Sequence, residues 1–360
     1  MTDNNKTRIV VGLSGGVDSS AAASLLVEQG YDVVGITLKV WPQDCVSRAE
    51  DKCCGPQAVM DARSVADKLD IPYYLVDESK EFQRDVIDYF AAEYKAGRTP
   101  NPCVMCNEKL KFGNLIDRAR KLGAEYVATG HYARLEQRDG RTVLLRGRDA
   151  RKDQTYFLFS LGQEQLAHMM FPLGELQKSE TREVARCVNL KTAEKQESQE
   201  ICFVPDKDYK KFLTTAGLVE EHRGEIVDTR GQVLGHHDGI EFYTIGQRKG
   251  LGISSPTPMY VIELDPENNR VVVGGEELLL RDEFRIDRCN WIAFDRLAKP
   301  IEASAAIRYN HPGTEATVIP GENGQATVKL REPQRAVTPG QACVFYQDDL
   351  VVGGGWIMRN

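Results

Sequence analysis

Residues 8–20 read Arg-Ile-Val-Val-Gly-Leu-Ser-Gly-Gly-Val-Asp-Ser-Ser, and this stretch decides the fold class. The β-branched run 8–12 predicts a buried strand, and the alanine-rich segment 19–29 predicts a helix that ends at Gly30. The glycines and serines between them predict a tight turn whose backbone N–H groups can surround an anion. The positive end of the following helix would strengthen such a phosphate site.

The turn lacks two features of other phosphate-binding loops. It has no Walker-type lysine, and it does not have the G-x-G-x-x-G spacing of dinucleotide folds. Ser14 and Ser19 can donate hydroxyl hydrogen bonds, and Asp18 can hold a Mg²⁺ that bridges phosphates. A purely structural turn is the alternative for the glycines alone. The whole string between a strand and a helix favours a phosphate site.

Strands and helices alternate up to about residue 129. Further strands are predicted at 32–38, 71–76 and 125–129, and further helices at 57–69, 81–95 and 107–122. This alternation is typical of the α/β class, with a parallel sheet covered on both faces. Ligands of such sheets lie beyond the carboxyl ends of the strands, where the glycine turn falls.

The pattern changes after about residue 210, where glycines and prolines separate short strand-like runs. These runs are 225–227, 259–264, 270–273, 303–309, 326–330, 342–346 and 350–352. Short strands with frequent turns are typical of all-β modules. We therefore expect three domains, with residues 1–209 forming the α/β domain, 210–279 a small central β-rich module and 280–360 a C-terminal β module.

Composition predicts a soluble globular protein, since 41% of the 360 residues are hydrophobic and 28% are charged. No apolar run approaches the roughly 18 residues of a membrane span, and the N-terminus has no signal-like apolar core. We therefore expect a cytoplasmic protein with no membrane partner. Because that compartment keeps thiols reduced, the nine cysteines predict catalysis or metal binding rather than structural disulfides. Cys187, Cys289 and Cys343 lie in apolar contexts and are interpreted as packing residues.

The charge distribution gives two indications about partners. The net charge of −7 argues mildly against a nucleic acid. Residues 95–121, however, carry seven basic and two acidic side chains, and residues 141–152 carry five basic and one acidic. These segments favour contact with RNA phosphates, although a solvated helix face remains the alternative for either one alone.

Several motifs resemble known families. The string SGGVDSS at 14–20 is similar to the PP-loop signature of ATP pyrophosphatases, which cleave ATP to AMP and pyrophosphate. Other segments resemble the bacterial tRNA-specific 2-thiouridylase family: 97–112 (GRTPNPCVMCNEKLKF), 128–133 (ATGHYA), 152–156 (KDQTY), 197–203 (ESQEICF), 239–252 (GIEFYTIGQRKGLG), 307–309 (IRY) and 336–341 (AVTPGQ). The resemblance thus covers nearly the whole chain, and it implies that the C-terminal β module is a barrel that contacts tRNA.

The resemblance implies an activity, which is ATP-dependent 2-thiolation of the wobble uridine of tRNA. ATP with Mg²⁺ would adenylate the 2-carbonyl oxygen, and a cysteine persulfide would deliver the sulfur. Cys202 would carry the persulfide, and Cys106 would attack or resolve it with formation of a disulfide bond. The implied partners are the Lys, Glu and Gln tRNAs and a persulfide donor protein.

The resemblance also implies roles for individual residues. The ATP contacts would be Gly12, Leu13, Ser14, Gly15, Gly16, Val17, Asp18, Ser19, Leu38 and Gly130. The target base would be bordered by Asn101, Pro102 and Cys103, and His131 would lie at the tRNA-facing edge of the site. Further tRNA contacts would be Lys152, Asp153, Gln154, Arg308, Tyr309 and Gln341.

Cys103 departs from the family pattern, since many members carry Asp at this position. A C-x-x-C pair therefore joins Cys202, and three thiolates suit a 4Fe–4S cluster with one open iron, or zinc. A plain dithiol site remains the alternative. Two other functions also remain open at this stage: a cluster-dependent tRNA cytidine thiolase with the same loop, and a nucleotide-gated RNA-binding protein without turnover.

Overall fold

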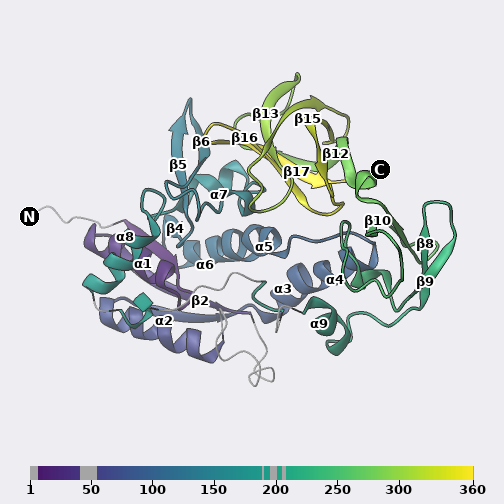
Figure 1. The fold of residues 1–360 in the computed structure, drawn as a ribbon. Coiled ribbons are helices and arrows are strands. Elements are labelled where there is room, and N and C mark those ends of the chain that lie inside the picture. Colours follow the sequence, from purple (N-terminus) through teal and green to yellow (C-terminus); the bar gives the residue numbers. More distant parts are fainter. Residues whose placement is uncertain (1–6, 41–54, 189, 195–200, 205–207, 360) are drawn as a thin grey trace, which may run out of the picture. The chain divides into compact units, whose positions relative to one another are not determined.

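The computed structural model describes residues 7–40, 55–188, 190–194, 201–204 and 208–359 (Figure 1). The chain divides into two compact units. Unit 1 comprises Met1–Val86, Cys103–Lys207 and Asp349–Val351, and unit 2 comprises Ile87–Pro102, Asp208–Asp348 and Val352–Asn360. The first part of the cysteine motif at 197–203, up to residue 200, lies outside the described residues.

The centre of unit 1 is a five-stranded parallel sheet with the order β3-β2-β1-β4-β7. Its strands are β1 (Arg8–Gly12), β2 (Asp32–Lys39), β3 (Tyr73–Asp77), β4 (Tyr126–Ala128) and β7 (Met169–Met170). The parallel α/β class and the first four strands are confirmed. The two-residue strand β7 was missed, because a run so short has no readable periodicity.

Three helices of unit 1 pack together beside this sheet, namely α1 (Val17–Glu28), α2 (Pro56–Leu69) and α8 (Lys178–Cys187). The alanines of α1 explain the close packing, since Ala21, Ala22 and Ala23 are completely buried and their small side chains allow α8 to approach. Gly30 follows α1 with φ +86°, the left-handed conformation that favours glycine after a helix. The predicted helix end at this glycine is confirmed.

The remaining helices of the first half largely match the expected ranges. The predicted helix 81–95 corresponds to α3 (Ser79–Phe82), a π-helical stretch η2 (Gln83–Ile87) and α4 (Asp88–Lys95). The predicted helix 107–122 corresponds to α5 (Pro102–Met105), a π-helical stretch η3 (Cys106–Asn114) and α6 (Leu115–Lys121). The sequence did not reveal the antiparallel hairpin β5 (Ala133–Arg138) and β6 (Arg141–Arg146) or the short helix α7 (Gln163–Ala167).

Unit 2 contains two β structures and a short helix α9 (Tyr209–Thr215). The first is a four-stranded sheet with the order β10-β11-β8-β9, formed by β8 (Gly224–Asp228), β9 (Val233–His237), β10 (Tyr260–Asp265) and β11 (Arg270–Gly274). The second has the strands β12 (Leu280–Trp291), β13 (Ile301–Ala306), β14 (Thr314–Pro320), β15 (Ala326–Arg335), β16 (Ala342–Gln347) and β17 (Leu350–Ile357).

The six C-terminal strands form an antiparallel barrel. Their order is β12-β15-β14-β13-β16-β17, and β12 also pairs with β17, which closes the ring. Phe284, Val328 and Phe345 from three strands meet in its core, with exposed residues alternating between buried ones along β12 and β15. The expected C-terminal barrel is confirmed. No helix among the described residues has the length and apolar character that crossing a membrane requires.

Candidate active site

The glycine turn lies at the carboxyl end of β1, between β2 and β4 in the sheet. Gly15 has φ +70°, and a Cβ at this residue would lie 2.2 Å from the carbonyl oxygen of Ala58 in α2. Both the conformation and the space therefore require glycine at this position. Gly16 follows in extended conformation as the N-cap of α1, so the backbone N–H groups at the start of the helix have no capping side chain from this residue.

Two serines hold the turn in shape. The hydroxyl oxygens of Ser14 and Ser19 lie 3.1 Å apart, and Ser19 Oγ also accepts a hydrogen bond of 3.1 Å from the N–H of Ser14. Thr37 in β2 donates a hydrogen bond of 2.6 Å to the carbonyl oxygen of Leu13. The turn is therefore braced from within and from the neighbouring strand, and its small residues and helix N-terminus fit a nucleotide phosphate.

Asp18, in the first turn of α1, binds two donors through one carboxylate oxygen. Oδ1 accepts a hydrogen bond of 3.0 Å from the hydroxyl of Tyr132, and Lys178 Nζ lies 2.5 Å from the same atom. Sequence reasoning missed Lys178, and the one available signal was the absence of a Walker-type lysine from the turn. Asp18 can supply one carboxylate to Mg²⁺, which commonly takes one or two carboxylates and completes its shell with substrate phosphates and water.

Gly130, two residues after β4, lies close to the backbone at the start of α1. A Cβ at Gly130 would lie 2.6 Å from both the carbonyl carbon of Asp18 and the backbone nitrogen of Ser19. Leu38 lies near the carboxyl end of β2, where it pairs with Val76 of β3. The residues expected to contact ATP thus belong to the carboxyl ends of β1, β2 and β4 and to the N-terminus of α1.

His131 is buried beside this segment, with 9% of its surface exposed. Its Nδ1 lies 2.7 Å from the hydroxyl of Thr129, and its ring packs near Phe112 and Phe171. Burial, and to a lesser extent the positive charge of Lys111, hold the pKa of His131 well below its usual value. The imidazole is therefore neutral at physiological pH.

The two candidate catalytic cysteines, Cys106 and Cys202, belong to unit 1 together with Cys103, which was expected to border the base or bind a metal. Cys103 lies in α5 and Cys106 begins η3, so they are one helical turn apart, and Cys202 lies in a turn beside Phe203, whose ring packs on Phe82. All three thiols are half-buried, and no disulfide joins any two of the described cysteines.

The structure does not support a metal cluster at these cysteines. No group of three metal-binding side chains comes together within the described residues, which include Cys103, Cys106 and Cys202. Cys103 and Cys106 lie one helical turn apart, but no third metal-binding side chain joins them among the described residues. We therefore take the iron–sulfur and zinc hypotheses no further.

The other cysteines that the structure describes differ in how far they are exposed to solvent. Cys343 is completely buried, and burial raises the pKa of its thiol. Burial and the nearby charge of Asp287 raise the pKa of Cys289 to about 12. Both fit the expected packing role. The same expectation was wrong for Cys187, which is exposed because it ends α8.

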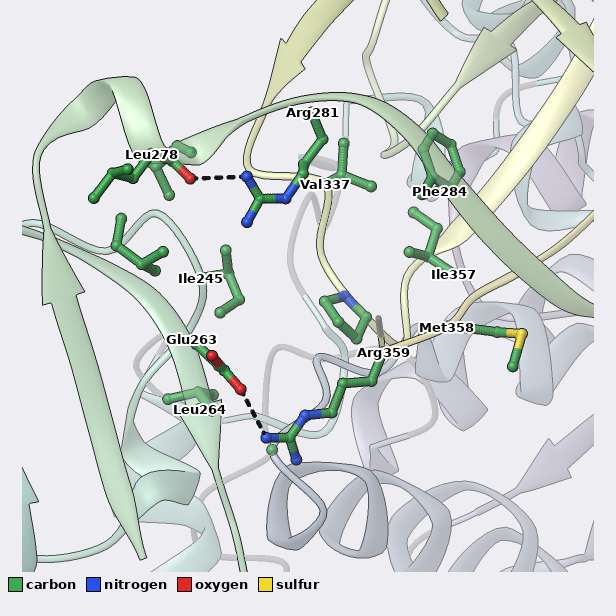
Figure 2. A pocket seen from close by; sticks show the side chains of 14 residues that line it. Ile245, Glu263, Leu264, Leu278, Arg281, Phe284, Val337, Ile357, Met358 and Arg359 are labelled. Atoms are coloured by element: carbon green, nitrogen blue, oxygen red, sulfur yellow. Dashed lines mark hydrogen bonds and ion pairs between the residues drawn. The ribbon is translucent and has the colours of Figure 1, made fainter. Parts of the chain in front are cut away.

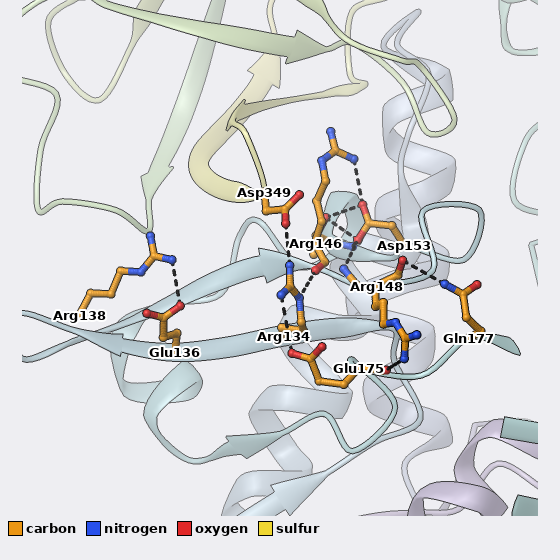
Figure 3. A network of polar contacts seen from close by, with 11 residues as sticks. Arg134, Glu136, Arg138, Arg146, Arg148, Asp153, Glu175, Gln177 and Asp349 are labelled. Carbon is orange, nitrogen blue, oxygen red and sulfur yellow. Dashed lines mark hydrogen bonds and ion pairs between the residues drawn. The ribbon is translucent and has the colours of Figure 1, made fainter. Parts of the chain in front are cut away.

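Two arginines of the basic stretch 141–152, Arg146 and Arg148, form polar contacts within the protein (Figure 3). Asp153 is buried and binds Arg146 at 3.1 Å, the N–H of Gly147 and the hydroxyl of Thr155, while burial raises its pKa. Gln154 accepts a hydrogen bond of 3.1 Å from the N–H of Tyr132. Two of the three residues expected to contact tRNA here thus fix the polypeptide around Tyr132, and Lys152 is half-buried.

Two of the expected tRNA contacts of unit 2, Arg308 and Gln341, help to line a hollow of about 460 Å³ together with Thr99. Gln341 Nε2 donates hydrogen bonds to the carbonyl oxygens of Thr99 and Pro100, at 3.0 and 3.2 Å. The N–H of Thr99 donates to the carbonyl of Pro339 at 2.8 Å. Gln341 therefore holds the segment that leads to Asn101 and Pro102. Tyr309 is exposed.

A second hollow of unit 2, of about 150 Å³, is mostly apolar (Figure 2). Its two guanidinium groups are engaged by the protein, since Arg281 donates to the carbonyls of Leu278 and Leu280 and Arg359 pairs with Glu263 at 3.1 Å. None of the residues expected to bind ATP or tRNA lines it.

Three domain families match this chain. A tRNA methyl transferase HUP domain matches residues 7–206, a tRNA methyl transferase PRC-barrel domain matches 210–275, and an aminomethyltransferase beta-barrel domain matches 281–357. The tRNA-specific 2-thiouridylase MnmA of Clostridium perfringens is 50% identical over 353 residues, which are 98% of both chains. That of Moorella thermoacetica is 51% identical over 351 residues, covering 97% of this chain and 98% of the relative.

Solved structures match this chain more distantly. A 4-thiouridine synthetase in complex with RNA and bound ATP is 18% identical, with a TM-score of 0.34. The match covers 59% of this chain and 50% of that structure's chain.

Proposed function

This chain belongs to the tRNA-specific 2-thiouridylase family, and we propose that it uses ATP to replace the 2-oxygen of a wobble uridine in tRNA with sulfur. The observation that carries the proposal is an identity of about one half over nearly the full length of relatives with that printed name. The descriptions of two matching domains mention methyl transfer. The match of the whole chain and the cysteines Cys106 and Cys202 favour thiolation.

The glycine turn is the proposed site of adenylation. The uridine 2-oxygen attacks the α-phosphorus of ATP, pyrophosphate leaves, and the oxygen is bound to AMP as a good leaving group. Gly12 to Ser19 supply backbone N–H groups and the N-terminus of α1 for the phosphates. Asp18 supplies a carboxylate for Mg²⁺, and Leu38 and Gly130 border the nucleotide. The braced turn and the glycine requirement at Gly15 support this role.

Sulfur transfer is assigned to two half-buried cysteines of unit 1. A persulfide donor protein places a sulfur atom on Cys202, and the terminal sulfur of the persulfide attacks C2 of the activated uridine and displaces AMP. The Cys106 thiolate then attacks the sulfur of Cys202, which releases the thiocarbonyl product and leaves a Cys106–Cys202 disulfide. A thiol reductant must reduce this disulfide before the next turnover.

Recognition of tRNA is assigned to the residues that the family resemblance implies. Asn101, Pro102 and Cys103 border the target base, which must leave its stack to be modified. Lys152, Arg308 and Tyr309 contact the RNA, and Gln341 acts through the segment 99–100 that it holds. His131, a neutral and buried imidazole, is assigned to the tRNA-facing edge of the site. We further propose the Lys, Glu and Gln tRNAs as substrates, a cytoplasmic location and the three-domain division at about residues 210 and 280.

The test of this function separates an enzyme from a nucleotide-gated binding protein. Purified protein should release AMP and pyrophosphate from ATP when tRNA and a persulfide donor are present. Asp18→Ala should abolish this release and leave tRNA affinity, measured by filter binding, within about twofold of the wild type, since the metal–phosphate contact depends on this loop. ATP binding without tRNA-dependent AMP release would favour the binding protein, and equal loss of tRNA affinity would contradict the role of Asp18.

A further inference from the structure

The glycine turn has an electrostatic requirement that its own residues do not meet. Asp18 places a carboxylate at the N-terminus of α1, where the phosphates of ATP are proposed to bind. The carboxylate and the phosphates are both negatively charged and therefore repel each other. The turn at 12–20 contains no lysine or arginine that could offset this charge. Bound Mg²⁺ would offset only part of the negative charge of ATP and Asp18, so a cation from elsewhere in the chain is favourable beside them.

Lys178 meets this requirement. Its Nζ lies 2.5 Å from Asp18 Oδ1, although the two residues are 160 positions apart in the sequence. The side chain of Lys178 is only 12% exposed, and its ammonium group lies 5.6 Å from the centre of the Tyr132 ring. Tyr132 in turn donates a hydrogen bond to the same oxygen of Asp18. The ammonium group is thus held against Asp18, in the first turn of α1 beside the proposed phosphate site.

The backbone around Lys178 is fixed independently of this ion pair. Its N–H donates a hydrogen bond of 3.0 Å to Asp149 Oδ2, and Glu180 accepts a hydrogen bond from the N–H of Gln177. Gln177 also bonds to the carbonyl of Arg148, and both residues are labelled in Figure 3. The first residue of α8 is therefore anchored through its backbone, independently of the contacts of its side chain.

We propose that Lys178 supplies the positive charge missing from the glycine turn and contacts the β- or γ-phosphate of ATP. The inference rests on the proposed adenylation function. Without nucleotide, Lys178 neutralises Asp18. With ATP bound, Asp18 turns to Mg²⁺ and the ammonium group of Lys178 binds the terminal phosphates, as a charge-assisted hydrogen bond donor.

The experiment measures the affinity of full-length protein for ATP, pyrophosphate and adenosine. Lys178→Met should weaken ATP and pyrophosphate binding by about ten- to a hundredfold, as loss of a hydrogen bond between charged groups does. Adenosine affinity should stay within about twofold, because adenosine has no phosphate. Lys178→Arg should restore most of the ATP affinity. The matched control is Arg186→Gln, which removes one positive charge from the exposed end of the same helix.

Magnesium-free ATP distinguishes phosphate contact from a merely structural ion pair. In excess chelator, Lys178→Met should weaken ATP binding, whereas Asp18→Asn should leave it unchanged or strengthen it, because removing the carboxylate removes repulsion. A structural ion pair predicts that both variants weaken ATP and adenosine alike, and this result would overturn the proposal. If Lys178→Met does not fold, Lys178→Gln, which keeps a donor for Asp18, makes the same comparison.

The outcomes also separate this inference from the proposed function. Wild-type protein that binds no ATP with or without magnesium would contradict the adenylation function itself. Wild-type protein that binds ATP while Lys178→Met and Lys178→Gln bind it equally well would contradict the role of Lys178 alone.

Discussion

The side-chain amide of Gln341 donates a hydrogen bond of 3.0 Å to the carbonyl oxygen of Thr99, a residue 242 positions earlier in the chain. A second bond of 3.2 Å goes to the carbonyl of Pro100. One side chain after the barrel strand β15 thus fixes the segment that precedes the proposed base-contacting residues Asn101 and Pro102. We expect this side chain to position other groups, whereas the family resemblance implies direct tRNA contact.

Gln341→Ala should therefore affect both stability and tRNA use. Losing the donor to two carbonyls should lower the free energy of unfolding by about 1–2 kcal/mol and raise the KM for tRNA more than it lowers kcat. Urea unfolding and thiolation kinetics measure the two effects. Gln347→Ala is the control, because Gln347 also donates to a barrel carbonyl, that of Glu302, but holds no part of 99–100. A weaker tRNA interaction with unchanged stability would mean that Gln341 acts by direct contact.

Cysteine reactivity should follow the environments of the thiols. Only the thiolate reacts, so the raised pKa values of Cys289 and Cys343 predict that both resist iodoacetamide at pH 8 in the native protein. Exposed Cys187 and half-buried Cys106 and Cys202 should be modified first. Peptide mass spectrometry after timed labelling measures this order. Native Cys343 that reacts as fast as Cys187 would show that the barrel core is open to solvent.

Cys103→Asp should remain active, with thiolation within about tenfold of the wild type. The reason is that the described residues hold no three-ligand metal group, so Cys103 is expected to border the base pocket and not to bind a cluster. Asp at this position also matches the commoner pattern of the family. Anaerobically prepared wild-type protein that binds stoichiometric iron, and loses iron and activity together in Cys103→Asp, would overturn this interpretation.

His131 should make stability depend on pH. The pKa of His131 is lowered in the folded state from about 6.5, so above pH 6.5 the histidine is neutral in both states and costs nothing. As pH falls below 6.5, the unfolded state takes up a proton that the folded state does not, and stability is lost. Between pH 7.5 and 5.5 the wild type should lose more stability than His131→Gln, by at most about 1.4 kcal/mol. Equal losses in urea unfolding would place the imidazole in contact with solvent.

The sequence predicted the features that depend on neighbouring residues. The run Arg8–Gly12, the glycine turn and the alanines of α1 form one local pattern, and their places in the structure followed from it. The hairpin β5–β6 was missed because its arginines resembled an RNA-binding patch, whereas Arg146 pairs with Asp153 inside the protein. The long strand β12 was also missed, since charged residues alternate with its buried Phe284 and Ile286.

The contacts of the candidate site that span the sequence could not be predicted. Lys178 reaches Asp18 across 160 residues, and Gln341 reaches Thr99 across 242. Neither pair leaves a pattern in a single sequence, because only the folded chain brings the partners together. The turn lacks a Walker-type lysine, and its sequence gives no indication of where in the chain another cation lies.

The most direct test of thiolation is mass spectrometry of nucleosides from a tRNA with a wobble uridine, incubated with the protein, ATP, Mg²⁺ and a persulfide donor. We expect 2-thiouridine at the wobble position, with one AMP and one pyrophosphate for each sulfur inserted. Cys106→Ser and Cys202→Ser should each retain less than about a thousandth of this rate, as residues of one catalytic unit do. Sulfur in a cytidine or at another position, or substantial thiolation by either variant, would contradict the account.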